Sequence, residues 1–253
     1  MKNIKNLIKL LSTMLLVFCT NTVAHAAVAF PTVTVGMTNA NTPQEFTQGV
    51  QILIMLTILT LAPSIFIMCT AFIRIIIVLA LTRQAIGTST LPPNQVLAGL
   101  ALILTFFVMA PTFNKINETA IQPYMKSQIT QQVAMDKAIL PLREFMIKHT
   151  EEKELGLFLS MAKIEKPKNW KDVPTYTLIP AYVISELNTA FKIGFVIFLP
   201  FLVIDIVVAS ILVSMGMLFL PPTTVAMPFK LILFVMIDGW YLITKTLLEG
   251  FIT

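Results

Sequence analysis

One four-residue segment has the residue types and spacing of a catalytic nucleophile. Ser160-Met161-Ala162-Lys163 matches S-x-x-K, in which a lysine assists a serine nucleophile in penicillin-binding enzymes. The companion patterns S-D-N and K-T-G are absent from the sequence, and so are H-E-x-x-H, a Walker A motif and G-x-S-x-G. A four-residue match without its companions arises easily by chance. The sequence therefore predicts no enzyme, no catalytic residue, no cofactor and no metal site.

A second group of residues with possible chemistry consists of charges within or beside long apolar segments. Arg74, Asp205 and Asp238 lie inside such segments, and Glu186 lies just ahead of one. A charge at the centre of a bilayer costs at least about 2.5–3.5 kcal/mol, so these side chains should face protein or water. We interpret them as buried ion pairs between helices or subunits, with a proton relay or pathway lining as the alternative. The sequence leaves open which acid pairs with Arg74.

These charges must be positioned by membrane helices, because 56% of the 253 residues are apolar and only 12% are charged. Soluble domains carry about 25% charged residues, so this composition is typical of a membrane protein. The predicted fold class is all-α, with about four hydrophobic helices in integral membrane hairpins and an inserted helical periplasmic domain. Removing residues 1–26 takes away three lysines and lowers the formal charge from +5 to +2, which leaves no basic tract for nucleic acid.

The first residues have the features of a secretory signal. A basic start is followed by an apolar stretch at 10–18 that is too short to span a bilayer. Ala24 and Ala26 then fit the small-x-small rule, which predicts cleavage after Ala26. An uncleaved first anchor is the alternative. Residues 27–45 are small and polar and are expected to form a loose leader.

The remaining chain alternates between apolar and charged regions. We predict a hydrophobic helical hairpin at 46–113, a periplasmic helical domain at 114–190 and a second hydrophobic hairpin at 191–253. The hydrophobic helices are expected at 46–81 with a kink at Pro63, at 96–113, at 193–220 and at 228–248.

The third apolar helix finishes in SMGMLFLPP, at 214–222. Methionine is flexible and polarisable, glycine allows close approach or bending, and proline cannot continue a helix. We therefore expect a blunt, pliable apolar tip, with ordinary lipid-facing or core packing as the alternative. Copies that met around an axis would form an apolar constriction, which excludes ions by dewetting. The predicted tip consists of Met215, Gly216, Met217, Leu218 and Phe219, with a helix break at Pro221 and Pro222.

Several ordered segments resemble the FliP/SctR family of type III export-gate proteins, from about residue 46 to the end of the chain. The most specific is PAYVISELNTAFKIG at 180–194. The cleavable signal favours the flagellar branch of this family. The supporting segments are FIRIIIV (72–78), PPNQVLAGLAL (92–102), LPLREFM (140–146), FLPFLVIDIVVAS (198–210) and PFKLILFVMIDGW (228–240).

The resemblance implies a pore-forming core subunit of the flagellar export gate, which passes unfolded flagellar proteins across the bacterial inner membrane. It implies a pentameric ring that assembles with FliQ and FliR in the flagellar basal body and receives substrates from FlhA, FlhB and an ATPase complex. It also implies that the hydrophobic helices are largely lifted out of the bilayer after assembly. Residues 215–219 would be the methionine gasket of the pore. Phe145 and Phe158 become candidates for aromatic contacts between subunits.

Three alternatives remain open. The first is a proton-coupled or small-solute transporter that uses Arg74, Asp205 and Asp238. The second is a membrane enzyme that uses Ser160 and Lys163. The third is an assembly scaffold whose pore is formed by other proteins.

Overall fold

The computed structural model describes residues 43–252, apart from positions 89, 166, 168 and 218. The predicted signal peptide with Ala24 and Ala26, most of the predicted leader, and Leu218 of the predicted tip lie outside the described residues. The chain divides into two compact units, Met1–Leu53 and Ile54–Thr253. The contacts below all belong to the second unit.

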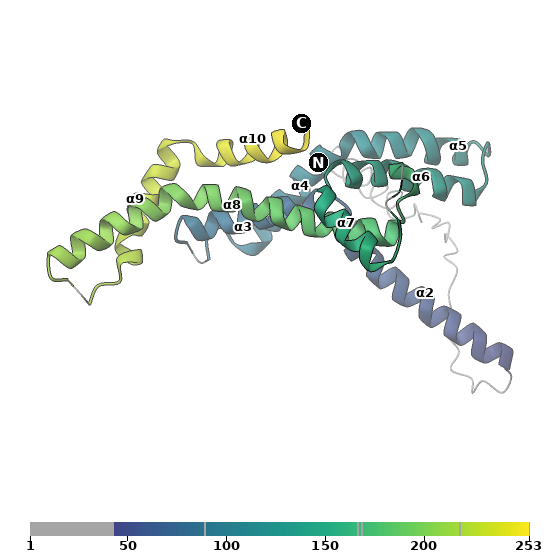
Figure 1. Ribbon diagram of the computed structural model, residues 1–253, viewed down its shortest axis with the longest axis horizontal. Coiled ribbons are helices and arrows are strands. Elements are labelled where there is room, and N and C mark those ends of the chain that lie inside the picture. Colours follow the sequence, from purple (N-terminus) through teal and green to yellow (C-terminus); the bar gives the residue numbers. More distant parts are fainter. Residues whose placement is uncertain (1–42, 89, 166, 168, 218, 253) are drawn as a thin grey trace, which may run out of the picture. The chain divides into compact units, whose positions relative to one another are not determined.

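The described part of the chain is helical and contains no strand, which confirms the predicted all-α class (Figure 1). The longest helix, α8, has 40 residues. The elements are α2 (Pro43–Met68), α3 (Phe72–Ala85), α4 (Asn94–Ile116), the π-helix η1 (Asn117–Ile121), α5 (Gln122–Met125), α6 (Gln131–Lys148), α7 (Glu152–Met161), the 3₁₀ helix η2 (Trp170–Asp172), α8 (Thr175–Ser214), α9 (Pro222–Met236) and α10 (Gly239–Ile252).

Three helical segments are long and apolar enough to cross a membrane: Val50–Met68, Asn94–Met125 and Thr175–Ser214. A fourth is obtained if α9 and α10 count as one broken span, since these helices are bent by 63° at their junction. The prediction of about four hydrophobic helices is therefore confirmed. The periplasmic position of the inserted region remains a prediction.

The predicted first hydrophobic helix is in fact two helices. It was expected to run over 46–81, but α2 continues through Pro63 and ends ahead of Thr70, and α3 begins just after it. The break is held by two hydrogen bonds. The Thr70 hydroxyl donates to the carbonyl of Ile67 at 2.8 Å, and the Tyr182 hydroxyl donates to the carbonyl of Thr70 at 2.8 Å. A side chain from distant α8 thus fixes this turn, which local sequence cannot reveal.

The predicted third and fourth helices also have different bounds. α8 was expected at 193–220, but it begins at Thr175 and ends at Ser214, and it runs without interruption through position 190. The helix expected at 228–248 is divided into α9 and α10. Asp238 stands at the division with a left-handed φ of +52°. An α-helix of L-residues cannot continue through such a residue.

α3 is the central packing element, with α8 and α4 against it. Its buried residues Ile75, Val78 and Leu79 recur at helical spacing, so one face of the helix enters the core. Gly194 of α8 permits the close approach of α3, because a Cβ at this position would collide with Leu81. α10 contributes Leu247 to the same core. The first and last hydrophobic segments therefore share one interior.

The charged region between α4 and α8 forms the short helices η1, α5, α6, α7 and η2. α6 packs against α4 and η1, while α7 packs against α8. Arg143 of α6 donates to the carbonyls of Lys171 and Val173 and so ties the segment before α8 to α6. A small second core lies here, made of Cys69, Met146, Val173, Leu178 and Tyr182.

Candidate functional site

The end of α8 is closed by a glycine. Gly216 has a φ of +75°, a conformation that glycine adopts readily because it has no Cβ. Its amide donates to the carbonyl of Val213 at 3.0 Å, and the Met217 amide donates to the carbonyl of Leu212 at 2.9 Å. This pair of bonds is the Schellman pattern, which ends many helices. Backbone geometry at one residue thus ends α8 well ahead of the two prolines.

The prolines have a different position from the one predicted. The helix was expected to reach residue 220 and to be broken by Pro221 and Pro222. Instead, Pro221 precedes α9 and Pro222 is its first residue. Proline is favoured at a helix start because its fixed φ suits the helix and its missing N–H would be unpaired there. The prolines therefore direct the chain into α9.

The tip between α8 and α9 presents apolar side chains to the outside of the chain. Met215 is 62% exposed, Met217 is 39% exposed and Phe219 is fully exposed. A Cβ at Gly216 would meet no atom within 4 Å, so the space around the turn is open. An apolar hollow of about 420 Å³ lies close by between α8 and α9, lined by residues such as Ile211. Single-chain packing therefore leaves large apolar groups uncovered here.

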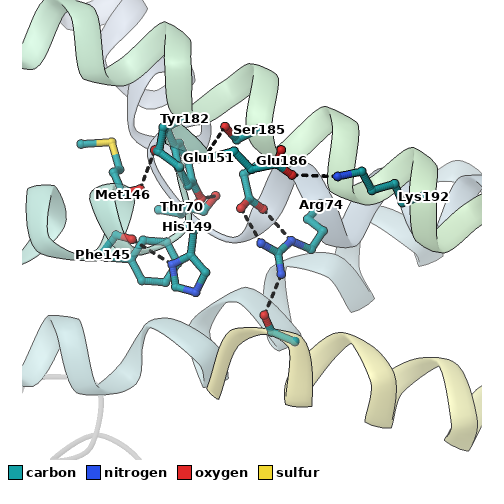
Figure 2. A network of polar contacts seen from close by, with 12 residues as sticks. Thr70, Arg74, Phe145, Met146, His149, Glu151, Tyr182, Ser185, Glu186 and Lys192 are labelled. Atoms are coloured by element: carbon teal, nitrogen blue, oxygen red, sulfur yellow. Dashed lines mark hydrogen bonds and ion pairs between the residues drawn. The ribbon is translucent and has the colours of Figure 1, made fainter. Parts of the chain in front are cut away.

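The opposite situation holds at Arg74, where charges are deeply buried (Figure 2). The Nε of Arg74 donates to Oε2 of Glu186 at 2.8 Å, and Nη2 donates to Oε1 at 2.5 Å. The two side chains are only 5% and 0% exposed. This two-pronged geometry is the strong form of an arginine–carboxylate pair. The structure thus pairs Arg74 with Glu186, which joins α3 to α8.

The third arm of the same guanidinium reaches the end of the chain. Nη1 of Arg74 donates to the carbonyl of Gly250 at 2.9 Å. The guanidinium carbon lies 3.9 Å from the centre of the Phe251 ring, in cation–π geometry. We call Arg74, Glu186, Gly250 and Phe251 the arginine hub. It connects three helices that are far apart in the sequence.

Further polar contacts surround the hub at the start of α7 (Figure 2). The backbone amide of Glu151 donates to Oγ of Ser185 at 3.0 Å. The Glu151 carboxylate forms an ion pair with Nζ of Lys192 at 2.8 Å, and the side chains of Glu151 and Lys192 are both substantially exposed. Because exposed pairs contribute little, the buried hub should dominate the stability of this region.

Asp205 and Asp238 lie in different environments. Asp205 of α8 accepts a hydrogen bond from Nζ of Lys230 in α9 at 2.6 Å, and the Lys230 side chain is only 6% exposed. The second carboxylate oxygen of Asp205, Oδ1, is buried without a hydrogen-bond partner among the described residues. Asp238 is exposed at the break between α9 and α10. A role for either residue as a subunit contact stays a prediction.

Phe145 and His149 pack beside the hub. The Phe145 ring contacts the rings of His149, Tyr182 and Phe251 at centroid distances of 4.6, 6.1 and 6.2 Å. Nδ1 of His149 lies 2.8 Å from the carbonyl oxygen of Phe145, and burial lowers the pKa of this imidazole. Phe145 thus has partners within its own chain. Phe158 is half-buried on α7, and subunit contacts by either phenylalanine remain predictions.

The S-x-x-K segment has a geometry unlike that of an activated serine. The Ser160 hydroxyl donates to the carbonyl of Leu157 at 2.7 Å. Lys163 lies beyond the end of α7 with a left-handed φ of +55°, and its backbone amide caps the helix by donating to the carbonyl of Ser160 at 3.0 Å. No side-chain hydrogen bond joins Ser160 to Lys163 in the described part of the chain. Likewise, no three His, Cys, Asp or Glu residues cluster around a possible metal position in that part.

Sequence reasoning found both members of the main ion pair but missed other contributors. Tyr182 lies within the signature segment, yet its bond to the break before α3 depends on folding. Lys230 is a cation in an apolar segment, and this signal could have suggested a partner for Asp205. Phe251 gave no signal, because an aromatic residue at the end of an apolar helix is unremarkable.

Comparison with known proteins places these features in a family. The FliP family model matches residues 55–247. The chain belongs to the FliP family. A Bacillus subtilis (strain 168) protein named flagellar biosynthetic protein FliP is 53% identical over 213 residues, which cover 84% of this chain and 96% of that protein. Two proteins of the same name, from Pectobacterium carotovorum and Aquifex aeolicus (strain VF5), are 50% and 48% identical, cover 83% and 80% of this chain, and are themselves covered over 82% and 86%.

The range matched by the FliP family model includes Arg74 and Glu186 of the arginine hub and all five residues of the tip. Both Arg74 and residues 215–219 fall within the matched range, while Gly250 and Phe251 lie just beyond it. The family match therefore confirms the resemblance to the FliP/SctR family that the sequence segments indicated. It does not by itself assign a role to any residue.

Proposed function

We propose that this chain is a pore-forming core subunit of the flagellar type III protein export gate. In this proposal several copies form a ring, and their tips at 215–219 meet on a common axis and close it. The ring passes unfolded flagellar proteins across the bacterial inner membrane. The chain carries out no chemistry of its own and takes no cofactor.

The observation that carries the proposal is the full exposure of Phe219 beside the exposed Met215 and Met217. Many apolar side chains of the membrane-length helices are exposed, but Phe219 is the most exposed large apolar residue that the structure describes. Contiguous apolar surface commonly marks a contact site. A ring of tips would cover these side chains with one another. A narrow pore lined only by apolar groups expels water and so blocks ions.

The same tip has the properties that opening requires. Methionine has three rotatable bonds and repacks easily around a new neighbour. A Cβ at Gly216 would meet no atom within 4 Å, so the turn is not packed against the rest of the chain at this position. A substrate chain that enters the ring would therefore displace the tips rather than bind to them. Phe219 is stiffer than methionine and should make this seal harder to deform.

The proposed partners are those that the resemblance to the FliP/SctR family implies. We propose a homo-oligomer that assembles with FliQ and FliR in the flagellar basal body, with FlhA, FlhB and the export ATPase complex delivering substrates. The apolar segments Val50–Met68 and Thr175–Ser214 fit a membrane location for the inserted chain. α8 would be about 60 Å long at 1.5 Å per residue, twice the thickness of the hydrocarbon core, so a helix that crosses close to the bilayer normal extends beyond that core.

A small-solute or proton-coupled transporter is supported less well. Such a mechanism needs ionisable groups that face an aqueous path. Arg74 and Glu186 are instead enclosed in a bidentate pair, and the Lys230 side chain is buried against Asp205. Arg74 and Asp205 each pair with a charge on another helix. Of the three residues that the transporter would use, Arg74, Asp205 and Asp238, only Asp238 is exposed.

The test is replacement of Met215, Met217 and Phe219 by alanine in the whole chain. We expect cells with this variant to leak ions, while rings of normal native mass still form with the partner subunits. Ion leakage is measured by membrane potential and conductance, and ring formation by native mass. The matched control is Tyr241→Ala, another large apolar residue exposed to 61% but located on α10. Unchanged conductance with intact rings would refute the seal.

A further inference from the structure

The last helix, α10, has little intrinsic stability of its own. It is only 14 residues long, and helices shorter than about 12–15 residues are marginal in water without tertiary contacts. Asp238 separates it from α9, so it gains no cooperativity from that neighbour. Its hold on the rest of the chain must come from its two ends and its one buried face.

The first end of α10 is fixed by an aromatic corner. Gly239 is buried under the ring of Phe234, and a Cβ at this position would collide with that ring. The Phe234 ring also meets Trp240 edge to face at 5.3 Å and Phe201 of α8 at 6.4 Å. The corner thus sets the 63° bend between α9 and α10.

The second end of α10 is fixed by Arg74. The last carbonyls of a helix have no partner within the helix, and cations there are favoured by the helix dipole. Arg74 supplies both a donor, to the carbonyl of Gly250, and a positive charge, and its guanidinium lies over the ring of Phe251. Phe251 is only 6% exposed, and it also packs against Phe145 of α6 and against His149, which directly follows α6.

The two functions of Arg74 depend on each other through the shape of its side chain. Glu186 accepts from Nε and Nη2, which fixes the plane of the guanidinium and leaves Nη1 aimed at Gly250. A lysine carries one freely rotating ammonium group and cannot reproduce this fixed fork. The carboxylate of α8 therefore orients the group that caps α10.

We propose that Arg74 is the C-terminal cap of α10 and that Glu186 is a positioning residue for this cap. In this arrangement α10 docks onto the chain only when the ion pair between α3 and α8 has formed. α10 then acts as a strap that is held at the aromatic corner and at the arginine hub. It arches over an apolar hollow of about 400 Å³, lined by residues of α8 and α10 such as Val196 and Leu242.

The test is hydrogen exchange of the purified full chain in detergent, read for each helix. In Arg74→Lys the charge stays beside Glu186 but the fixed third donor is lost, so the amides of α10 should exchange about tenfold faster, as for one lost hydrogen bond to a charged group. In Phe251→Ala the same amides should exchange about a hundredfold faster because a buried ring is removed. In both variants the amides of α10 should accelerate more than those of α3 and α8.

Two comparisons make the result decisive. Tyr241→Ala removes an exposed ring from the same helix and should leave every exchange rate unchanged. If Phe251→Ala does not fold, Phe251→Leu keeps apolar volume but loses the cation–π contact, and it should accelerate α10 by an intermediate factor. Wild-type exchange of α10 in Arg74→Lys would overturn the cap. Equal acceleration of α3, α8 and α10 would overturn the dependence of α10 on the hub. Both readouts are independent of ion leakage through a pore.

Discussion

The tip at 215–219 and the arginine hub differ in almost every physical property. The tip consists of apolar side chains that have no cover, at a turn held by two backbone hydrogen bonds. The hub consists of a charged pair that is almost fully buried and satisfied within the chain. The polar groups of the hub are satisfied by contacts within the chain, whereas the apolar side chains of the tip are not covered by the chain.

This difference separates what a single chain needs in order to fold from what it offers to neighbours. A buried charge must be paired before the chain is stable, because an unpaired one costs several kcal/mol. An exposed apolar tip costs little in the monomer and gains free energy only when something covers it. Substitutions in the hub should therefore act on folding, and substitutions of the exposed apolar side chains of the tip should act on assembly or sealing.

The largest expected effect is that of Glu186→Ala. Removing one partner of a buried ion pair leaves Arg74 uncompensated, and we expect a loss of about 3–5 kcal/mol of unfolding free energy. Chemical denaturation of the detergent-solubilised protein measures this loss. The matched control is Glu144→Ala, which breaks the ion pair with Lys115 between side chains that are more than half exposed. That control should change stability by no more than about 1 kcal/mol.

Equal losses in the two glutamate variants would remove the contrast between hub and surface. A further sharpening comes from replacing both members, as Arg74→Met with Glu186→Leu. Apolar replacement of a buried pair is often neutral or stabilising, so part of the lost stability should return. The docking of α10 should not return, since the donor to Gly250 is absent.

The hub also shows how far sequence reasoning reaches. An arginine and a glutamate near membrane-length apolar segments must find partners, so both residues were identified from the cost of burying charge. Their mutual pairing depends on α3 lying against α8, because the two residues are 112 positions apart in the sequence. The same limit applies to the turn at Thr70, because the Tyr182 hydroxyl that holds it is equally distant along the chain. The local sequence pattern predicts which residues need a partner, whereas the tertiary fold determines which residue that partner is.

Gly216→Ala is expected to have the next largest effect, at the tip. A left-handed conformation costs an L-residue about 1–2 kcal/mol. No atom lies within 4 Å of the added Cβ, so this conformational term should act alone. Thermal unfolding in detergent should show a loss of about this size, and the tip should also seal less well.

Gly156→Ala is the control for this glycine. Gly156 also has open space around a Cβ, but it lies inside α7 without a positive φ. Alanine in a helix interior should stabilise by about 0.5–1 kcal/mol. The two substitutions are chemically identical, so opposite signs would establish the role of the left-handed turn. The same sign in both would contradict it.

The helix end at the tip was mispredicted for a related reason. Two consecutive prolines are a stronger indication of a helix end in the sequence than a single glycine, so the break was expected at Pro221 and Pro222. The Schellman bonds form as soon as Gly216 takes its left-handed φ, and α8 ends there. Similarly, Asp238 with its positive φ divides α9 from α10 inside a segment whose apolar length predicted one helix. Glycine and aspartate both tolerate a left-handed φ, but residue type does not show at which positions they adopt it.

His149 should give the hub region a modest pH dependence. Burial lowers its pKa in the folded chain, and the hydrogen bond to the Phe145 carbonyl opposes this lowering only in part, while the unfolded chain keeps the ordinary value of about 6.5. Below that value the unfolded state binds a proton that the folded state resists, so stability falls as the pH drops. Thermal midpoints should fall less between pH 7.5 and 5.5 in His149→Gln than in the unchanged chain. Equal falls would mean that other groups carry the dependence.

Ser160→Ala should have the smallest effect of all. The exposed hydroxyl donates only to the carbonyl of Leu157 one turn back, and such surface changes usually lie within about 0.5 kcal/mol. Lys163, held beyond the helix end by its positive φ, forms no side-chain bond with Ser160 in the described part of the chain. We therefore expect unchanged unfolding and unchanged swimming of cells that carry the variant. Lost motility with normal stability and normal rings would show that chemistry exists outside both the tip and the hub, and it would revive the catalytic interpretation of the S-x-x-K segment.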